Sequence, residues 1–251
     1  MSRNFELLRQ ASWSQEFFQD MPTEAPTEVP SRDTNRRRMK RPPPGNDQVS
    51  VFVRRAFLNP HNPSVRSIMF AGLYRRAGCT WTCAQTAKIL ADSVDGDICA
   101  VDTNFHAPAL HHHFLGQPQG GLSDAMCASK PAAESAKQVN GSNLWLVPVG
   151  YQNERARSMM DSTILEKHLR ELRNRFDYLL IDGVLQGSGT GVPAGCRAVD
   201  GVVLVAESGG IEPKMVFSLR RRLESAHVPL LGVVLNQRLA ERASMFERLI
   251  R

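Results

Sequence analysis

The run Ser67-Ile-Met-Phe-Ala71 is apolar after its first residue, and the chain continues as Gly72-Leu-Tyr-Arg-Arg-Ala-Gly78-Cys79-Thr80 before a helical pattern over Thr82–Ala91. A strand, a glycine-containing turn and a helix start are the parts of a phosphate-binding loop, in which backbone N–H groups face the anion. Gly78 and Thr80 fit the pattern G-x-x-x-x-G-K-[ST]. Cys79 stands at its lysine position, and the first glycine is displaced by one residue. The stretch therefore predicts an α/β fold with a candidate anion site after its first strand.

Similar apolar runs alternate with helical patterns further along the chain. Strands are predicted at 97–101, 144–147, 178–181, 201–205 and 231–235, and helices at 163–175 and 213–226. Uninterrupted apolar strands between helices indicate a sheet that is buried on both sides. We therefore predict a mostly parallel β-sheet with helices on both faces.

Aspartates end two of these strands. Asp102 follows the second strand and Asp182 the fourth. The carboxyl ends of parallel strands meet at one edge of a sheet, where ligands bind, and carboxylates there are candidate ligands of nucleotide-bound Mg²⁺. The alternative role for each is to cap the turn that follows its strand.

The N-terminal part of the chain differs from the rest. Residues 1–20 hold enough apolar side chains for a short helical segment, whereas residues 21–47 are rich in proline and contain the basic run Arg36-Arg-Arg-Met-Lys-Arg41. Such a composition predicts a disordered linker. We therefore divide the chain into the segment 1–20, the linker 21–47 and an α/β domain over 48–251.

The composition argues against a membrane-spanning or secreted protein. No apolar stretch is long enough to span a bilayer, no secretory signal is visible, and the five cysteines show no paired spacing, which is typical of reduced thiols in a cytoplasm. The net charge is +6, of which residues 48–251 carry +5 without dense clustering (23 Lys and Arg against 18 Asp and Glu). No motif accompanies this surplus, and nucleic acid is not the expected partner.

Taken together, the order of segments resembles the cytoplasmic kinase domain of bacterial tyrosine kinases (BY-kinases) of capsule and exopolysaccharide synthesis. These kinases lie within the deviant-P-loop ATPases, the MinD/ParA-like group. Val101-Asp-Thr-Asn-Phe-His-Ala-Pro-Ala-Leu-His-His-His-Phe114 is similar to their D-x-D-x-R-x-P-x-L-H-x-x-F segment, and Gly121-Leu-Ser-Asp124 to their G-L-S-D turn. Further segments with the family's order are Asn143–Gly150, Phe176–Asp182, Ala198–Val205 and Leu231–Asn236.

The resemblance implies a P-loop NTPase fold that takes ATP or ADP with Mg²⁺. Carried over by position, it implies catalytic roles for Asp102 and Asp182, and Mg²⁺ ligation by Thr80, Asp102 and Asp182. It implies nucleotide contacts from Arg75, Arg76, Gly78, Cys79, Thr80 and Thr82. The family's oligomerisation helix, E-x-x-R-x-x-R, should precede the first strand; residues 48–58 occupy that place without the full pattern.

The positions at which this sequence departs from the family are those that carry the family's chemistry. Cys79 replaces the loop lysine, Asn104 the second acidic residue and His106 the arginine. The chain has three tyrosines in all, and its final residues, Glu241–Arg251, contain none, although the family autophosphorylates a C-terminal tyrosine cluster.

We therefore expect a degenerate BY-kinase-like protein, a pseudokinase or regulatory partner in exopolysaccharide or capsule biosynthesis and export. Its expected partner is a membrane polysaccharide copolymerase (adaptor) or a paralogous active kinase, which would hold it at the inner face of the plasma membrane; homo-oligomers are a further expectation. One alternative is an active tyrosine kinase in which Arg75 or Arg76 replaces the lysine. The other is a ParA/MinD-type positioning ATPase.

Three smaller groups of residues complete the prediction. Metal binding by His111-His112-His113 is set aside because consecutive histidines on a helix point in different directions. Cys79 and Cys83 are interpreted as structural residues in preference to a redox pair. Trp81 and Trp145 are predicted to lie in the core.

Overall fold

The structure is a computed structural model, and it describes residues 47–58, 65–72, 76–114, 120–159, 163–185, 192, 194–207 and 213–236. The chain divides between Arg37 and Arg38 into two compact units. The first unit lies outside the described residues, as do the predicted helical segment 1–20 and all of the predicted linker except Asp47.

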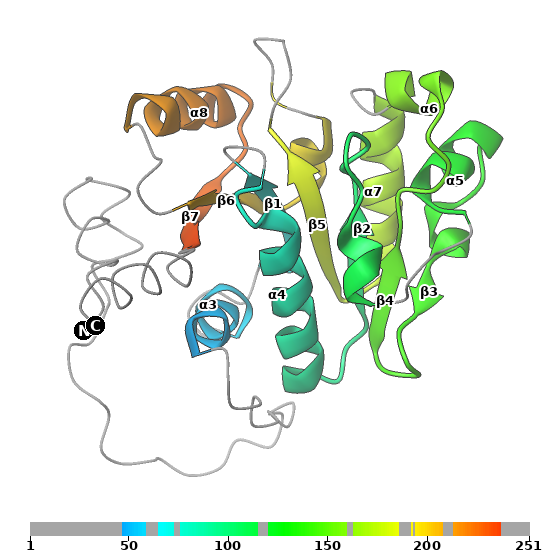
Figure 1. The fold of residues 1–251 in the computed structure, drawn as a ribbon, viewed down its shortest axis with the longest axis horizontal. Helices are drawn as coiled ribbons and strands as arrows, with labels where there is room; N and C mark the ends of the chain where they lie inside the picture. Colours follow the sequence, from blue (N-terminus) through cyan, green and yellow to red (C-terminus); the bar gives the residue numbers. More distant parts are fainter. Residues whose placement is uncertain are drawn as a thin grey trace, which may run out of the picture. The chain divides into compact units, whose positions relative to one another are not determined.

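A seven-stranded sheet organises the second unit, with strand order β3-β4-β2-β5-β1-β6-β7 (Figure 1). Only the short β3 runs antiparallel to its neighbour, β4; the other neighbouring strands are parallel. The predicted mostly parallel sheet is therefore confirmed. The bounds are β1 Ser67–Gly72, β2 Ile98–Asp102, β3 Lys137–Gln138, β4 Leu144–Val147, β5 Tyr178–Val184, β6 Gly201–Glu207 and β7 Leu230–Asn236.

Helices cover both faces of this sheet, as predicted. In Figure 1, α4 and α3 lie in front of the strands and α7 lies behind them. The strands of the centre are apolar on both sides because both sides are covered, and every residue of β1 and β2 is buried. The helices are α3 Asp47–Phe57, α4 Cys79–Ser93, α5 Leu122–Ala128, α6 Glu154–Met159, α7 Thr163–Arg175 and α8 Pro213–Ser225, with short 3-10 helices η1 Leu110–His113, η2 Ala132–Ser135 and η3 Ala194–Ala198.

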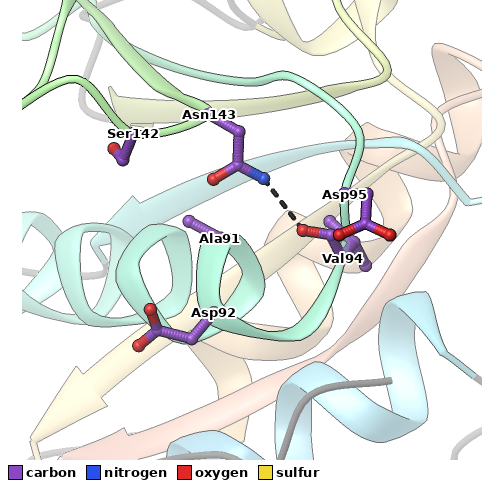
Figure 2. Close-up of a pocket in the computed structure, with 6 residues that line it drawn as sticks. All are labelled: Ala91, Asp92, Val94, Asp95, Ser142 and Asn143. Carbon is purple, nitrogen blue, oxygen red and sulfur yellow. Dashed lines mark hydrogen bonds between the residues drawn. The ribbon is translucent and has the colours of Figure 1, made fainter. Parts of the chain in front are cut away.

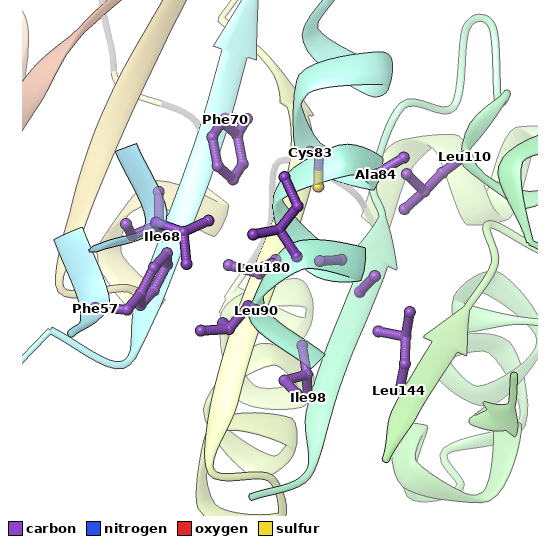
Figure 3. Close-up of a cluster of buried hydrophobic side chains, with 14 of the residues drawn as sticks. Phe57, Ile68, Phe70, Cys83, Ala84, Leu90, Ile98, Leu110, Leu144 and Leu180 are labelled. Carbon is purple, nitrogen blue, oxygen red and sulfur yellow. The ribbon is translucent and has the colours of Figure 1, made fainter. Parts of the chain in front are cut away.

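The core in front of the sheet is formed by α3 and α4 (Figure 3). Ile68 and Phe70 of β1 point toward Cys83, Ala84 and Leu90 of α4, which are completely buried. Helix α3 occupies the place expected for the family's N-terminal helix. Its Phe57 ring packs edge-on against Tyr178, and its Phe52 ring against Phe70, with centroids 5.9 and 5.8 Å apart. Aromatic contacts of this kind stabilise the packing of α3 against the sheet.

In the described part of the chain, no helix has the length and apolar character needed to cross a membrane.

Parallel pairing sets the position of the residues singled out above. Asp182 of β5 is in register with Phe70 of β1 on one side and with Asp102 of β2 on the other. The strand ends of β1, β2 and β5 therefore form one edge, and the start of α4 lies at this edge directly after β1.

Candidate functional site

The start of α4 is built on two residues with left-handed backbone conformation. Arg76 has φ 67° and Gly78, the N-cap, has φ 89°. Glycine adopts this region freely, whereas arginine adopts it at a cost of about 1 kcal/mol or more. Among the described residues no side chain caps the helix start, so its first N–H groups have no capping hydrogen bond there. This arrangement is suited to an anion at the helix end.

Asn236, the last residue of β7, holds this loop from the other side. Its Nδ2 donates to the carbonyl oxygen of Ala77 at 3.1 Å, across 159 positions of sequence. A Cβ placed on Gly78 would lie 1.9 Å from the same Nδ2. Gly78 is thus required both by its backbone angle and by the room that Asn236 takes. The sequence analysis assigned no role to Asn236; its one signal was a polar residue at the carboxyl end of an apolar strand.

Asp182 faces the start of α4 from β5. Its side chain is 1% exposed, and it lies beside the side chains of Thr80 and Cys79. Its Oδ2 has no hydrogen-bond partner among the described residues. Burial raises the pKa of this carboxyl to about 6, although the neighbouring Thr80 and Cys79 side chains lower it. An unpartnered buried carboxylate oxygen beside a hydroxyl is a donor set that suits Mg²⁺.

Asp102 lies next to Asp182 but is used differently. One carboxylate oxygen accepts from the Asn104 N–H at 2.9 Å, and the other accepts from the Ala109 and Leu110 N–H groups at 3.1 Å each. Asp102 therefore caps the loop after β2, which is the alternative role considered for it. Burial, with a smaller contribution from Asp182, raises its pKa to about 7 against these three hydrogen bonds. Mg²⁺ ligation by Asp102 stays a prediction.

Cys79 brings a neutral group to the position of the lysine. The side chain is half-buried, and its Sγ donates to the Gly183 carbonyl oxygen at 3.7 Å. Burial, and then the neighbouring Asp182 carboxylate, raise the pKa of the thiol well above its ordinary value. Burial raises the pKa of Cys83 in the same way. Both cysteines are therefore thiols at neutral pH, which agrees with a structural role and not with a reactive thiolate pair.

The structure thus brings Gly78, Cys79 and Thr80 together with Asp102 and Asp182 at one edge. Three further residues were predicted to contact the nucleotide. Arg75 lies outside the described residues, the Arg76 side chain is exposed, and the Thr82 side chain is buried. Thr82 donates both its N–H and its hydroxyl to the Gly78 carbonyl at 2.9 Å. Thr82 therefore contributes to the packing of the helix start, and its contact with a nucleotide stays a prediction.

Two other features of the described residues lie apart from this site. His111 and His112 pack ring against ring with centroids 4.0 Å apart, and among the described residues no group of three or more His, Cys, Asp or Glu side chains could hold a metal ion. A pocket of about 320 Å³ lies at the opposite end of α4 (Figure 2). There the Asn143 amide donates to the carbonyl oxygens of Val94 and Gly96, so it closes the turn before β2.

Comparison with known proteins agrees with this geometry. No family model matches the chain. Over 117 residues, 47% of this chain, it is 25% identical to the tyrosine-protein kinase CpsD of Streptococcus agalactiae. It spans about half the length of that relative, 51%. It is 23% identical over 175 residues to the succinoglycan biosynthesis transport protein ExoP of Rhizobium meliloti, covering 68% of this chain and 22% of ExoP.

The chain resembles the BY-kinases. The predicted resemblance is therefore confirmed, at the level of a BY-kinase-like protein similar to those of capsule and exopolysaccharide biosynthesis.

Solved structures show the same fold. The chimeric protein CapA2B2 has a TM-score of 0.67 at 20% identity, covering 78% of this chain and 86% of that one. The VpsO kinase domain has a TM-score of 0.66 at 20% identity, covering 76% and 95%. MinD of Pyrococcus horikoshii, solved with Mg-ADP, has a TM-score of 0.56 at 18% identity, covering 70% and 71%. These similarities establish the P-loop NTPase fold of this BY-kinase-like chain.

The buried carboxyl pair makes the stability of this BY-kinase-like chain depend on pH. Because folding raises the pKa values of Asp102 and Asp182 from 3.8 to about 7 and about 6, the folded state retains protons that the unfolded state loses. The pair's contribution to stability should therefore fall as pH rises from about 4 to about 7. Asp182→Asn removes one of these two carboxyls. The free energy of unfolding of the variant, measured relative to that of wild type, should therefore be higher at pH 8 than at pH 4 by at least about 1 kcal/mol. Urea denaturation across this range measures the effect.

The exposed carboxyl of Asp92, on the same helix α4, supplies the control: Asp92→Asn should leave the difference between pH 4 and pH 8 as it is in wild type. An Asp182→Asn profile parallel to that of wild type would contradict the account of the pair.

Proposed function

We propose that this chain is a pseudokinase, a regulatory partner in exopolysaccharide or capsule biosynthesis that holds a nucleotide without transferring its phosphoryl group. One observation carries the proposal: the neutral thiol of Cys79 stands where the BY-kinases place a lysine, beside two buried carboxyls. The similar protein CpsD is named a tyrosine-protein kinase, and the name of ExoP, a succinoglycan biosynthesis transport protein, supports the assignment to polysaccharide synthesis and export.

The remaining groups fit a nucleotide with Mg²⁺. The uncapped helix start at Gly78 offers backbone N–H groups to phosphate oxygens, and the Thr80 hydroxyl and Asp182 carboxylate would hold Mg²⁺, with Asp102 behind them. When bound, the ion neutralises phosphate charge. The chain's own residues would orient the phosphates, and burial keeps water from Asp182, which is mostly ionised above its pKa of about 6.

The missing charge limits phosphoryl transfer. A positive group at position 79 would stabilise the charge that develops on the transferred group, and the loss of one such donor costs about 10²–10³ in rate. The Cys79 thiol carries no charge and is committed to the Gly183 carbonyl. Asn104 in place of the second acid removes a further charged oxygen near the metal. The site is therefore suited to binding and not to turnover.

A second candidate, the active tyrosine kinase, is favoured by Arg76. This residue keeps a left-handed backbone, which only glycine adopts without cost, and its side chain is exposed at the loop. Arginine binds phosphate oxygens through two parallel N–H groups, so Arg76 is the residue of this loop that would replace the lysine. The two candidates differ in one property, turnover.

The proposed partner is a membrane polysaccharide copolymerase or a paralogous active kinase. Such a partner would place the chain on the inner face of the plasma membrane and supply the catalysis that it lacks. The proposal rests on the similarity to ExoP, whose name describes a transport protein.

Polysaccharide made by variant strains tests the regulatory role. Deletion of the gene should change the amount or the chain length of the polymer, because the partner loses its regulator. A strain with Cys79→Ala should match wild type, because the thiol performs no chemistry. Size-exclusion analysis of the purified polymer measures both. A Cys79→Ala strain with the defect of the deletion would count against a regulatory role without phosphoryl transfer.

A further inference from the structure

Trp81 is not in the core, and the prediction that placed it there is wrong. Its side chain is 40% exposed, whereas Thr82, Cys83 and Ala84, which follow it on α4, are buried. The reason is helical periodicity: Trp81 shares the outer face of α4 with Gln85, Lys88 and Asp92, all of them partly or fully exposed. A single exposed aromatic side chain is ordinary on a protein surface, so what matters for Trp81 is where on α4 it lies.

The position of Trp81 ties it to the candidate site. It lies in the first turn of α4, directly after Thr80, whose side chain lies beside Asp182. Side chains of a helix lean toward its N-terminus, so the indole covers the surface next to the helix start. The first N–H groups of α4 lack a side-chain cap, and Asp182 points an unpartnered Oδ2 into the same place. These two observations independently mark the helix start as a place for a ligand.

We infer that Trp81 is the stacking platform for the base of a nucleotide whose phosphates lie on the start of α4. The inference rests on the proposed function and adds the part of the ligand that the phosphate loop does not recognise. An indole offers its flat π face to any nucleobase, and contact with a base removes both surfaces from water. The ligand class is a nucleoside di- or triphosphate, as opposed to an inorganic polyphosphate or an anionic surface.

Paired titrations of the full chain with Mg-ADP and with Mg-tripolyphosphate test this assignment. Trp81→Ala should weaken ADP binding about tenfold and leave tripolyphosphate binding within about twofold of wild type. Trp81→Phe should keep most of the ADP affinity. Alanine is a good helix former at an exposed position, so the variant should fold. Trp145→Phe is the matched control: this half-buried Trp of β4 donates to Asp97 at 3.3 Å and should not alter either affinity.

The outcomes separate this inference from the proposed function. Wild-type protein that binds both ligands, together with a Trp81→Ala variant that weakens both equally or neither, would overturn the stacking role alone. Wild-type protein that binds neither ligand at millimolar concentration would overturn the nucleotide site and the stacking role together.

Discussion

Gly78→Ala should cost the protein about 3–4 kcal/mol in the free energy of unfolding. The alanine must adopt φ near 89°, and its Cβ would meet the Asn236 amide at 1.9 Å, so the amide must leave the Ala77 carbonyl. Left-handed backbone costs about 1–2 kcal/mol, and crowding and the lost hydrogen bond about 1 kcal/mol each or more. Urea denaturation followed by circular dichroism measures the sum.

Gly141→Ala separates the two causes. Gly141 also has positive φ, 67°, but a Cβ there would meet nothing within 4 Å. This variant should therefore lose only the backbone part, about 1 kcal/mol. Equal losses in the two variants would show that the contact with Asn236 contributes nothing to the loop.

Cys79→Lys should strengthen the binding of Mg-ATP at least about tenfold. The new ammonium would lie beside Asp182 and the helix start, where it can pair with phosphate oxygens. It should also lower the pKa values of Asp102 and Asp182, because a nearby positive charge favours ionised carboxylates. Calorimetric titration at pH 7 measures the affinity for Mg-ATP. Urea denaturation as a function of pH reports the change in the pKa values of the two carboxyls.

Cys79→Met is the matched control for this experiment, since methionine extends the side chain without a charge. The methionine variant should bind Mg-ATP no more tightly than wild type. Equal affinities in the lysine and methionine variants would mean that charge at position 79 does not limit the site, and would remove the main argument for a pseudokinase.

Much of the fold was predictable because its central strands are buried on both sides. Uninterrupted apolar runs marked β1, β2, β4, β5, β6 and β7, and the structure places strands over all six. Helix α4 begins three residues earlier than predicted, since the Cys79-Thr80-Trp81 segment carries no helical pattern of its own. The two-residue β3 and the short α5 and α6 were not predicted, because elements of this length show too few periods of hydrophobicity.

The candidate site was predictable where it depends on parallel pairing. The predicted places of Asp102 and Asp182 at the ends of buried strands were enough to put both at one edge of the sheet, and the structure adds that they are in register on neighbouring strands. Asn236 was missed because it lies 159 positions from Ala77 in the sequence. Only the strand order β1-β6-β7 brings the two residues into contact. The prediction that Trp81 is buried was wrong because it rested on the general tendency of tryptophan to be buried. It did not take into account that Trp81 lies on the outer face of α4.

The central claim, binding without phosphoryl transfer, is tested most directly by incubating the full chain with γ-labelled ATP and Mg²⁺ and following phosphate release and label transfer to protein. The account predicts that wild type and Asp182→Ala both stay at the level of a protein-free blank. Release or transfer by wild type that is lost in both Asp182→Ala and Arg76→Ala would contradict it and establish an active kinase with a rearranged loop.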